Sequence, residues 1–557
     1  MPQDAYTLRR VAGELKNLLT DGKISKINMP ERDELSLIIY TRSGSVKLEI
    51  SCSAKNNRIS LSQTEKPNPQ VAPNFCMLLR KHLQNAQITD VSEVGAERII
   101  KIDFSCTSDF SDSKMSLYCE IMGKYSNIIL VEKGIILGAV KQTSLEENTR
   151  RILFSGAKYT LPAPQDKADP TDLSAIKAAF ENKSGDAATF ISSAIGGIAY
   201  STALEMVETF GEGITAEQVF GYFNGDESAP CITFDEKGEP RDFKVRSVDG
   251  SAKRYPDVLS AQRDYYAAVY KKQTFEEQKR KLLSALKSAI KKAEKRLAQI
   301  ESKLLECQTA ETVRLKGELI TANIYRLERG MTSFNAVNYY DENSPEISIA
   351  LDRQLTPSQN AQKYFRQYAK LKRTLVALTS QRDEIRLKYD YLNSINSSIC
   401  AAECIEDLKE TADELAAEGL IKQTDDKRRK IAQPSPFRVY KTGGFTIVSG
   451  RNNAQNDRLI KSLSPDDIWL HTRRFHSSHV GIITEGKAVP DDVILKAAEI
   501  CAYYSEARDK DKVAVDFTAR KNVKKPPKSH PGFVTYNEYT SINVLPCAHR
   551  ELSDEEK

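Results

Sequence analysis

The sequence predicts a multidomain α+β protein in which a long antiparallel coiled coil with a small tip joins two mixed domains. Residues 1–171 alternate helical and strand-like patterns, the middle carries two heptad seams, and a mixed pattern resumes after residue 433. The chain has 557 residues, 40% of them hydrophobic. At roughly 150 residues per domain this length allows about four domains. Wholesale disorder is excluded by this composition.

The first segment, 1–171, is predicted to be a mixed domain. Its helices are expected at 8–19, where apolar residues recur at helical spacing, and at 75–83, which has a cationic edge. Short alternating runs bounded by turn residues predict strands at 35–40, 46–51, 99–104 and 128–131. Prolines at 162, 164 and 170 then indicate an exit linker.

The second segment, 172–256, is predicted to contain a helix-hairpin-helix. Its helical pattern is interrupted at Ile195-Gly196-Gly197-Ile198 and then resumes. Such a turn can present backbone N–H groups to a phosphate. An ordinary small helical hairpin is an equally good interpretation.

The middle of the chain predicts two helical arms, 257–330 and 358–432, on either side of a tip at 331–357. Apolar residues alternate steps of three and four, which is the pattern of a coiled-coil seam. The first seam contains Leu283, Leu286, Ile290, Ala293, Leu297, Ile300, Leu304 and Cys307. The second contains Tyr364, Tyr368, Leu371, Leu375, Leu378, Arg382, Ile385, Tyr389 and Leu392. The first helix is expected to run continuously over 258–327, and a strand is expected at 347–351 in the tip.

Positive charge is concentrated rather than spread. The whole chain carries +5, yet residues 262–303 hold twelve Lys or Arg against five Asp or Glu, a net charge of +7. A solvated helix face is the ordinary explanation, but a one-signed excess favours contact with a polyanion. A basic, proline-bearing linker at 427–436 leads into the last segment.

The last segment, 433–557, is predicted to be an α+β RNA-binding domain. His471, His476 and His479 cluster around Arg473, Arg474 and Trp469, the only tryptophan. A zinc site is one interpretation of these histidines, but no cysteine pair or zinc motif accompanies them, so no metal is expected. Cations that meet phosphates and rings that stack on bases suit an RNA surface better. A buried tryptophan with surface histidines is the alternative.

A basic track, defined as residues 520–528, holds five cations: Arg520, Lys521, Lys524, Lys525 and Lys528. Pro526 and Pro527 favour an extended backbone, which suits contact with a sugar-phosphate chain. A disordered basic loop is the alternative.

The sequence gives no sign of a catalytic site, cofactor or membrane segment. It contains no nucleophile elbow, phosphate loop or nucleotide fingerprint, so no catalytic residue and no cofactor are expected. No apolar run is long enough to span a membrane, and no signal peptide is evident. Ten scattered cysteines favour reduced thiols and hence a cytoplasmic protein.

The chain resembles the NFACT family of ribosome-quality-control proteins. The resemblance covers nearly the whole length and rests on motifs at 75–83, 97–100, 120–129, 355–365, 450–457, 467–472, 478–480 and 520–525. It implies a glycosylase-like N-terminal domain of the formamidopyrimidine-DNA-glycosylase type, followed by the helix-hairpin-helix, the coiled coil and an RNA-binding C-terminal domain.

The resemblance also implies a function. Members bind large ribosomal subunits, through rRNA and proteins, when these still carry peptidyl-tRNA. They recruit a tRNA, usually alanyl-tRNA, and promote template-independent alanine tailing of the nascent chain, while the ribosome performs peptidyl transfer. The protein is therefore expected to be a factor and not an enzyme, and to act as a monomer without a membrane partner.

Residue by residue, the resemblance implies two sets of contacts. The tRNA would be bound by Glu97, Arg98, Gly123, Lys124, Ser126 and Asn127. In the C-terminal domain, RNA would be contacted by Trp469, His471, Arg473, Arg474, Ser478, His479, Arg520, Lys521, Lys524 and Lys525. Glu97 stands where the family has Asp, and Lys124 and Tyr125 stand where it has Arg and His.

Two other functions were weighed. A glycosylase would need Pro2 as nucleophile and a neighbouring glutamate, but Gln3 follows, and an amide cannot transfer protons as a carboxyl does. A surface fibronectin-binding adhesin is the second alternative, because relatives carry that label.

Overall fold

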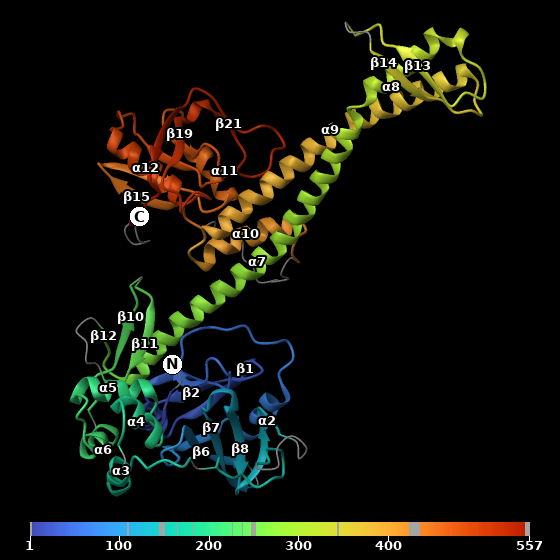
Figure 1. The fold of residues 1–557 in the computed structure, drawn as a ribbon. Helices are drawn as coiled ribbons and strands as arrows, with labels where there is room; N and C mark the ends of the chain where they lie inside the picture. Colours follow the sequence, from blue (N-terminus) through green and yellow to red (C-terminus); the bar gives the residue numbers. More distant parts are fainter. Residues whose placement is uncertain are drawn as a thin grey trace. The chain divides into compact units, whose positions relative to one another are not determined.

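A computed structural model describes ten stretches of the chain: 3–108, 111–143, 151–163, 165–181, 183–225, 227–236, 238–246, 252–341, 345–422 and 435–551. They belong to two compact units, Met1–Gln273 and Thr274–Lys557 (Figure 1). The basic part of the predicted linker, 427–430, and Pro434 lie outside the described residues. Within these stretches, no helix combines the length and apolar character that crossing a bilayer requires.

The first unit is built on an antiparallel sheet. Among the described residues nine strands form it, in the order β4-β3-β2-β1-β5-β6-β7-β8-β9. Their bounds are β1 (Lys23–Glu31), β2 (Glu34–Thr41), β3 (Gly44–Ser51), β4 (Arg58–Leu61), β5 (Gln87–Glu93), β6 (Ile99–Ser108), β7 (Ser111–Glu120), β8 (Asn127–Glu132) and β9 (Ile135–Ala139). The strands expected at 35–40, 46–51, 99–104 and 128–131 are confirmed within β2, β3, β6 and β8.

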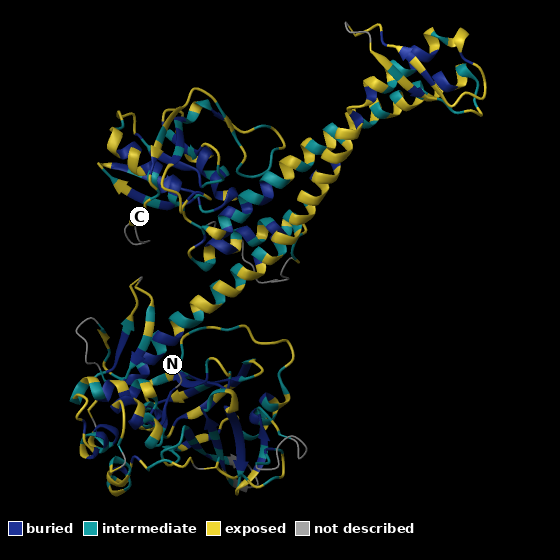
Figure 2. Cartoon of the chain, in the orientation of Figure 1, coloured by how far each residue is buried: buried dark blue, intermediate teal, exposed yellow. Residues whose placement is uncertain are grey.

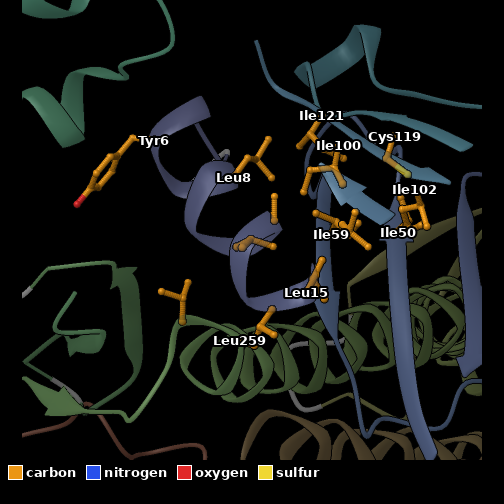
Figure 3. Close-up of a cluster of buried hydrophobic side chains, with 14 of the residues drawn as sticks. Tyr6, Leu8, Leu15, Ile50, Ile59, Ile100, Ile102, Cys119, Ile121 and Leu259 are labelled. Atoms are coloured by element: carbon orange, nitrogen blue, oxygen red, sulfur yellow. The ribbon is translucent and has the colours of Figure 1, made fainter. Parts of the chain in front are cut away.

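Two helices supply the rest of this core. α1 (Ala5–Leu19) and α2 (Asn74–Leu83) confirm the predicted helices. Leu8, Leu15 and Leu19 lie on one face of α1 and are buried in the core that the strands form. Figure 3 shows Leu8 and Leu15 in this core. The side chain of Asp4 caps this helix by accepting the backbone N–H of Thr7 at 2.9 Å. α1 is therefore fixed at its first turn, beside the segments described next.

Four short helices follow: α3 (Leu173–Phe180), α4 (Ala187–Ala194), α5 (Tyr200–Phe210) and α6 (Ala216–Asn224). The predicted helix-hairpin-helix is not confirmed. In the turn between α4 and α5, the N–H of Gly196 donates to Ala168 O at 2.8 Å, and that of Ala199 to Asp4 Oδ2 at 3.0 Å. These two groups are already satisfied within the protein, so they are not free for a phosphate.

A small sheet of β10 (Cys231–Phe234), β11 (Pro240–Lys244) and β12 (Lys253–Arg254) completes this unit, and the sequence did not predict it. α7 (Val258–Cys307) starts here, with Val258 and Leu259 in the core. The backbone N–H groups of both residues donate at 2.9 Å to the carboxylate of Glu14 on α1. That carboxylate satisfies two N–H groups that the first turn of a helix leaves without partners.

In the second unit, α7 and α9 (Pro357–Cys400) run antiparallel. Lys279 Nζ donates to Cys400 O at 2.9 Å, and Glu294 accepts from Tyr389 at 3.2 Å. Glu311 of the next helix, α8 (Ala310–Ala322), accepts from Tyr368 at 3.4 Å. Partner numbers fall along α9 as they rise along α7 and α8, as an antiparallel pair requires. The residues of the first seam are buried or half-buried, whereas most of their helical neighbours are exposed (Figure 2).

The expectation of one helix over 258–327 is corrected. α7 ends at Cys307, and a separate α8 (Ala310–Ala322) begins after a break at Gln308 and Thr309. At the tip, α8 packs against α9 and against the two strands β13 (Ser333–Val337) and β14 (Glu346–Ala350). The strand expected at 347–351 is confirmed with a shift of one residue.

The C-terminal domain has a sheet covered on both faces. Six antiparallel strands are described, in the order β15-β16-β18-β17-β19-β22. They are β15 (Arg438–Thr442), β16 (Phe445–Ser449), β17 (Ile468–Thr472), β18 (Val480–Ile483), β19 (Val513–Ala519) and β22 (Thr540–Val544). α12 (Asp491–Tyr503) shares a core with Leu470 on one face, and α11 (Asn453–Ser462) shares another with Trp469 on the opposite face. Because side chains alternate along a strand, neighbouring residues of β17 are buried on opposite sides.

Candidate nucleic-acid interface

The predicted N-terminal site lies in turns that join inner strands of the large sheet. Glu97 and Arg98 occupy the turn between β5 and β6, and the backbone N–H of Ile121, just after β7, donates to Arg98 O at 2.8 Å. The next turn, 123–127, follows immediately in sequence. The antiparallel pairing of β6 with β7 therefore brings the two predicted motifs together.

A cavity of about 520 Å³, called here the N-terminal cavity, opens beside this turn. It is lined by Glu97 and Arg98, by Lys167, and by the α4–α5 turn including Gly196 and Tyr200. The side chains of Glu97 and Arg98 are half-buried. In the described part of the chain neither of these side chains has an ion pair or hydrogen bond. A guanidinium without an internal partner is free to bind phosphate in a bidentate manner.

The turn at 123–127 contains residues that hold its conformation and residues that are exposed to solvent. Gly123 has φ +59°, a conformation that favours glycine. Ser126 is buried, donates to Gly123 O at 2.8 Å and accepts the Met122 N–H at 2.8 Å. Asn127 is also buried. Gly123, Ser126 and Asn127 therefore shape the turn. The contact of Ser126 and Asn127 with tRNA stays a prediction.

The exposed part of this turn is Lys124 with Tyr125. Lys124 Nζ lies 4.9 Å from the centre of the Tyr125 ring, whose residue is 71% exposed. A cation beside an exposed aromatic ring is a common surface for RNA, which combines charge with stacking. Tyr125 was not among the predicted site residues, nor was the exposed Tyr200 that lines the cavity. Their aromatic character was the available signal.

In the C-terminal domain the prediction for Trp469 is corrected. Its side chain is fully buried, so it presents no face to a base. The cause is the position of β17 between β18 and β19, with α11 covering the face on which Trp469 lies. The tryptophan is a core residue around which the neighbouring rings are arranged.

Two of the predicted histidines pack around that tryptophan. The His471 ring is parallel to Trp469 with centroids 5.8 Å apart, and His479 meets both edge-on, at 5.3 Å from Trp469 and 5.2 Å from His471. Burial lowers the pKa of His471 to about 4 and holds that of His479 well below its usual value. Both imidazoles are therefore neutral at physiological pH and do not act as cations toward phosphate.

The neighbouring residues 473, 474 and 478 differ in whether their side chains are exposed and free to bind RNA. Arg473 is exposed but is held by Tyr539, whose hydroxyl oxygen accepts at 2.9 Å, and by Asp516 at 3.5 Å. Arg474 is exposed, and the described residues give its side chain no partner. Ser478 is buried, with its N–H donating to Tyr504 O at 3.0 Å. Arg474 is thus the available cation of this group, and Ser478 supports the loop.

The basic track is ordered, but not all of its cations are free. Arg520 is half-buried and donates through Nε to Ile460 O at 2.9 Å. Lys521 pairs with Asp466 at 3.2 Å, and Lys525 pairs with Asp457. Lys524 is exposed and has no side-chain partner among the described residues. Of the four residues of the track that were predicted to contact RNA, Lys524 is therefore the best placed to bind a phosphate.

The motif at 450–457 forms an internal joint that sequence reasoning did not identify. Arg451 pairs with Asp407 of α10 (Ile405–Ala417) at 3.1 Å, and Asn452 donates to Glu410 at 2.7 Å. Asn453 donates to Ser394 of α9 at 3.0 Å. Its polar residues thus attach the C-terminal domain to the base of the coiled coil.

One group of side chains has the composition of a metal site. Within the described ranges, one set of three side chains could hold an ion: Glu499, Cys547 and His549, whose ligand atoms lie within 4.8 Å of one another. His549 Nε2 and Glu499 Oε2 already contact each other at 2.8 Å. The histidine cluster at 471–479 does not form such a set.

Comparison with known proteins gives the family. Residues 4–433 match the model described as NFACT N-terminal and middle domains, and residues 436–536 match the NFACT protein RNA binding domain. The fold and the two sites are thus those of a multidomain protein with an RNA-binding module. The chain belongs to the NFACT family.

Two curated relatives match almost the whole chain. The Rqc2 homolog RqcH of Streptococcus suis is 33% identical, covering 98% of both chains, and that of Bacillus subtilis is 31% identical, covering 96% of both. An archaeal Rqc2 homolog from Methanocaldococcus jannaschii is 26% identical over 57% of this chain and 50% of its own.

Solved structures include two parts of the fibronectin/fibrinogen-binding protein of Streptococcus suis. Its N-terminal part is 25% identical with a TM-score of 0.42, covering 47% of this chain and 98% of that one. Its C-terminal part is 31% identical with a TM-score of 0.39, covering 49% and 96%.

Proposed function

We propose that this protein acts in ribosome-associated quality control. It binds large ribosomal subunits that still carry peptidyl-tRNA, recruits alanyl-tRNA, and promotes template-independent alanine tailing of the nascent chain. The observation that carries this proposal is the match to RqcH relatives over almost the entire length, across both family domains. A role at the ribosome places the protein in the cytoplasm.

The N-terminal cavity supports the tRNA part of the proposal. Arg98 lines it without an internal partner, and Lys124 and Tyr125 stand exposed on the adjoining turn. These residues supply a bidentate phosphate donor, a point charge and a stacking ring, which together suit a folded RNA. The C-terminal domain would contact rRNA through Arg474 and Lys524.

The ribosome would perform peptidyl transfer in this proposal, so the protein acts as a factor. Gln3 follows the residue that a glycosylase would use as nucleophile. It is buried, and both ends of its side-chain amide are hydrogen-bonded within the protein. Its amide donates to Ile59 O and accepts the Ile59 N–H, both at 3.1 Å. Gln3 thus ties the N-terminus to β4. The adhesin alternative is not favoured, since the relatives spanning the full chain are named for RqcH.

Co-sedimentation tests the proposal. The tagged protein should be recovered with free large subunits, and sequencing of the co-purified tRNA should show enrichment of alanine tRNA. A matched Arg98→Ala variant should keep the subunits and lose the tRNA enrichment. Recovery with intact ribosomes only, or with no ribosomal particle, would contradict the proposal.

A further inference from the structure

The C-terminal domain contains a second cavity, of about 650 Å³, called here the C-terminal cavity. One wall is the end of α9, from Glu384 to Ala401, and the opposite wall is the segment 471–479. The loop 526–534, which continues from the basic track, forms a third side. This volume is within the range of small-molecule sites.

The aromatic side of the C-terminal cavity contains an unsatisfied polar group. His479 lines the cavity and is 2% exposed, yet its Nδ1 has no hydrogen-bond partner in the described part of the chain. Nδ1 has almost no accessible surface, so the half-buried ring of His471 is the part of this wall that a ligand meets first. His471 lies beside His479, and both rings are neutral. Neutral heterocycles suit an uncharged planar ligand better than an anion.

The mouth of the cavity carries the charges. Arg474 and Lys528 line it, are exposed, and have no side-chain partner among the described residues. Phe533, 45% exposed, and Leu387, 55% exposed, add apolar surface. Two acidic residues, Glu384 and Asp390, lie on the α9 wall, whereas the unpaired cations lie on the other two sides, Arg474 in the segment 471–479 and Lys528 in the loop 526–534. A ligand with a planar, uncharged part inside the cavity and an anionic part at its mouth would match these walls, and a nucleotide has both parts.

We propose that the C-terminal cavity binds one unstacked nucleotide, with its base against His471 and His479 and its phosphate at Arg474 and Lys528. The inference rests on the proposed RNA-binding function and assigns a place where the domain holds a single base. Because the basic track leads into the loop 526–534, an RNA strand can follow the track and turn one base inward. Stacking of this kind tolerates different bases.

The only tryptophan gives a direct readout. Trp469 contacts both histidines and Tyr536, so occupation of the cavity changes the surroundings of its indole. The full-length protein should be titrated with a short single-stranded RNA, and separately with adenosine and uridine monophosphates, while tryptophan emission is recorded. A change with RNA alone assigns the site to a strand, and a change with the monophosphates as well assigns it to free nucleotides.

A cavity-filling variant distinguishes this proposal from RNA binding in general. Ser398→Phe places a ring inside the cavity from α9, and Ser380→Phe is the matched control on an exposed position of the same helix. Arg474→Ala, with Lys512→Ala as control, tests the mouth. Ser398→Phe and Arg474→Ala should each weaken RNA affinity by roughly tenfold and abolish the emission change, with the controls unchanged.

These experiments distinguish failure of the cavity proposal from failure of the proposed RNA-binding function. If the native protein binds RNA, but its emission is unchanged and Ser398→Phe binds as tightly, the cavity does not hold a base and the proposed RNA-binding function stands. If the native protein binds no RNA at all, both fail. Circular dichroism of each variant, together with the Arg474→Ala result, guards against misfolding as the cause of a loss.

Discussion

The side chain of Asn127 forms two hydrogen bonds with the backbone of Lys141. Its Oδ1 accepts the Lys141 N–H at 2.9 Å, and its Nδ2 donates to Lys141 O at 2.7 Å. This pairing fixes the start of β8 and with it the 123–127 turn that presents Lys124 and Tyr125. A buried amide therefore determines where an exposed cation and ring stand.

Asn127→Ala should lower the free energy of unfolding of the first unit by about 2 kcal/mol, because two buried backbone groups lose their partner. It should also weaken tRNA binding, because the turn is no longer held. Chemical denaturation and tRNA titration measure the two effects. Asn17→Ala, at an exposed position of α1, is the control and should change neither. Weaker binding with full stability would instead indicate direct contact by Asn127.

Arg98→Ala should reduce tRNA affinity by about tenfold, which corresponds to about 1.4 kcal/mol, and leave thermal stability unchanged. The reason is that its side chain has no internal partner to lose. Arg98→Lys should recover part of the affinity, since it keeps the charge without the bidentate geometry. Arg42→Ala, which removes an exposed arginine from the same unit, is the matched control. A comparable loss of stability in Arg98→Ala would show a structural role.

Lys524→Ala should reduce the salt dependence of RNA binding. Loss of one phosphate contact changes the slope of log affinity against log salt by about 0.7 to 0.9. Lys521→Ala should have a smaller effect, because Lys521 already pairs with Asp466. Affinity measured across a series of salt concentrations provides the slope, with Lys512→Ala as reference. Equal slopes for all of these variants would show that the basic track faces solvent in the complex.

Acidification should destabilise the C-terminal domain partly through His471. Its pKa is about 4 in the fold, against an ordinary value near 6.5, so the unfolded state binds the proton more readily. Stability is therefore lost as pH falls from about 6.5 toward 4. His471→Asn should flatten this dependence, whereas His82→Gln in the other unit should not. Tryptophan emission during denaturation at several pH values measures it, and parallel curves for variant and native protein would contradict the assignment.

Asp407→Ala should destabilise the joint between α10 and the C-terminal domain by about 3 to 5 kcal/mol, since the buried Arg438 and the half-buried Arg451 lose their shared carboxylate. Glu406→Ala, on the exposed side of the same helix, should have little effect. Limited proteolysis and thermal unfolding report the difference. Unchanged protease resistance in Asp407→Ala would show that the apolar contacts alone hold the joint.

Local sequence patterns were sufficient to predict the helices and strands whose apolar residues recur at regular spacing. Leu35, Leu37 and Ile39 predicted β2, and the spacing of Leu8, Leu15 and Leu19 predicted α1. The break at Gln308 and Thr309 was missed because neither residue is a glycine or proline, the residues that most strongly interrupt a helix.

In the candidate sites, too, some features could be predicted from local sequence and others could not. Arg98 and Lys124 were located by motif, and their availability agrees with a binding role. Trp469 was misjudged because its burial depends on α11 and Val523, which pack on the same face of the sheet. The role of the motif at 450–457 was missed because its partners lie on α9 and α10, which are remote in sequence. Burial of a central strand is a property of its neighbours, so flanking cations could not reveal it.

The antiparallel pairing of α7 with α9 restricts how this protein can change in length during evolution. Deleting seven residues from one helix removes about 10 Å of rise. The opposite helix must lose a matching stretch, or the contacts between Glu294 and Tyr389 and those beyond them fall out of step. Insertions and deletions in related chains should therefore occur as compensating pairs, equidistant from the tip.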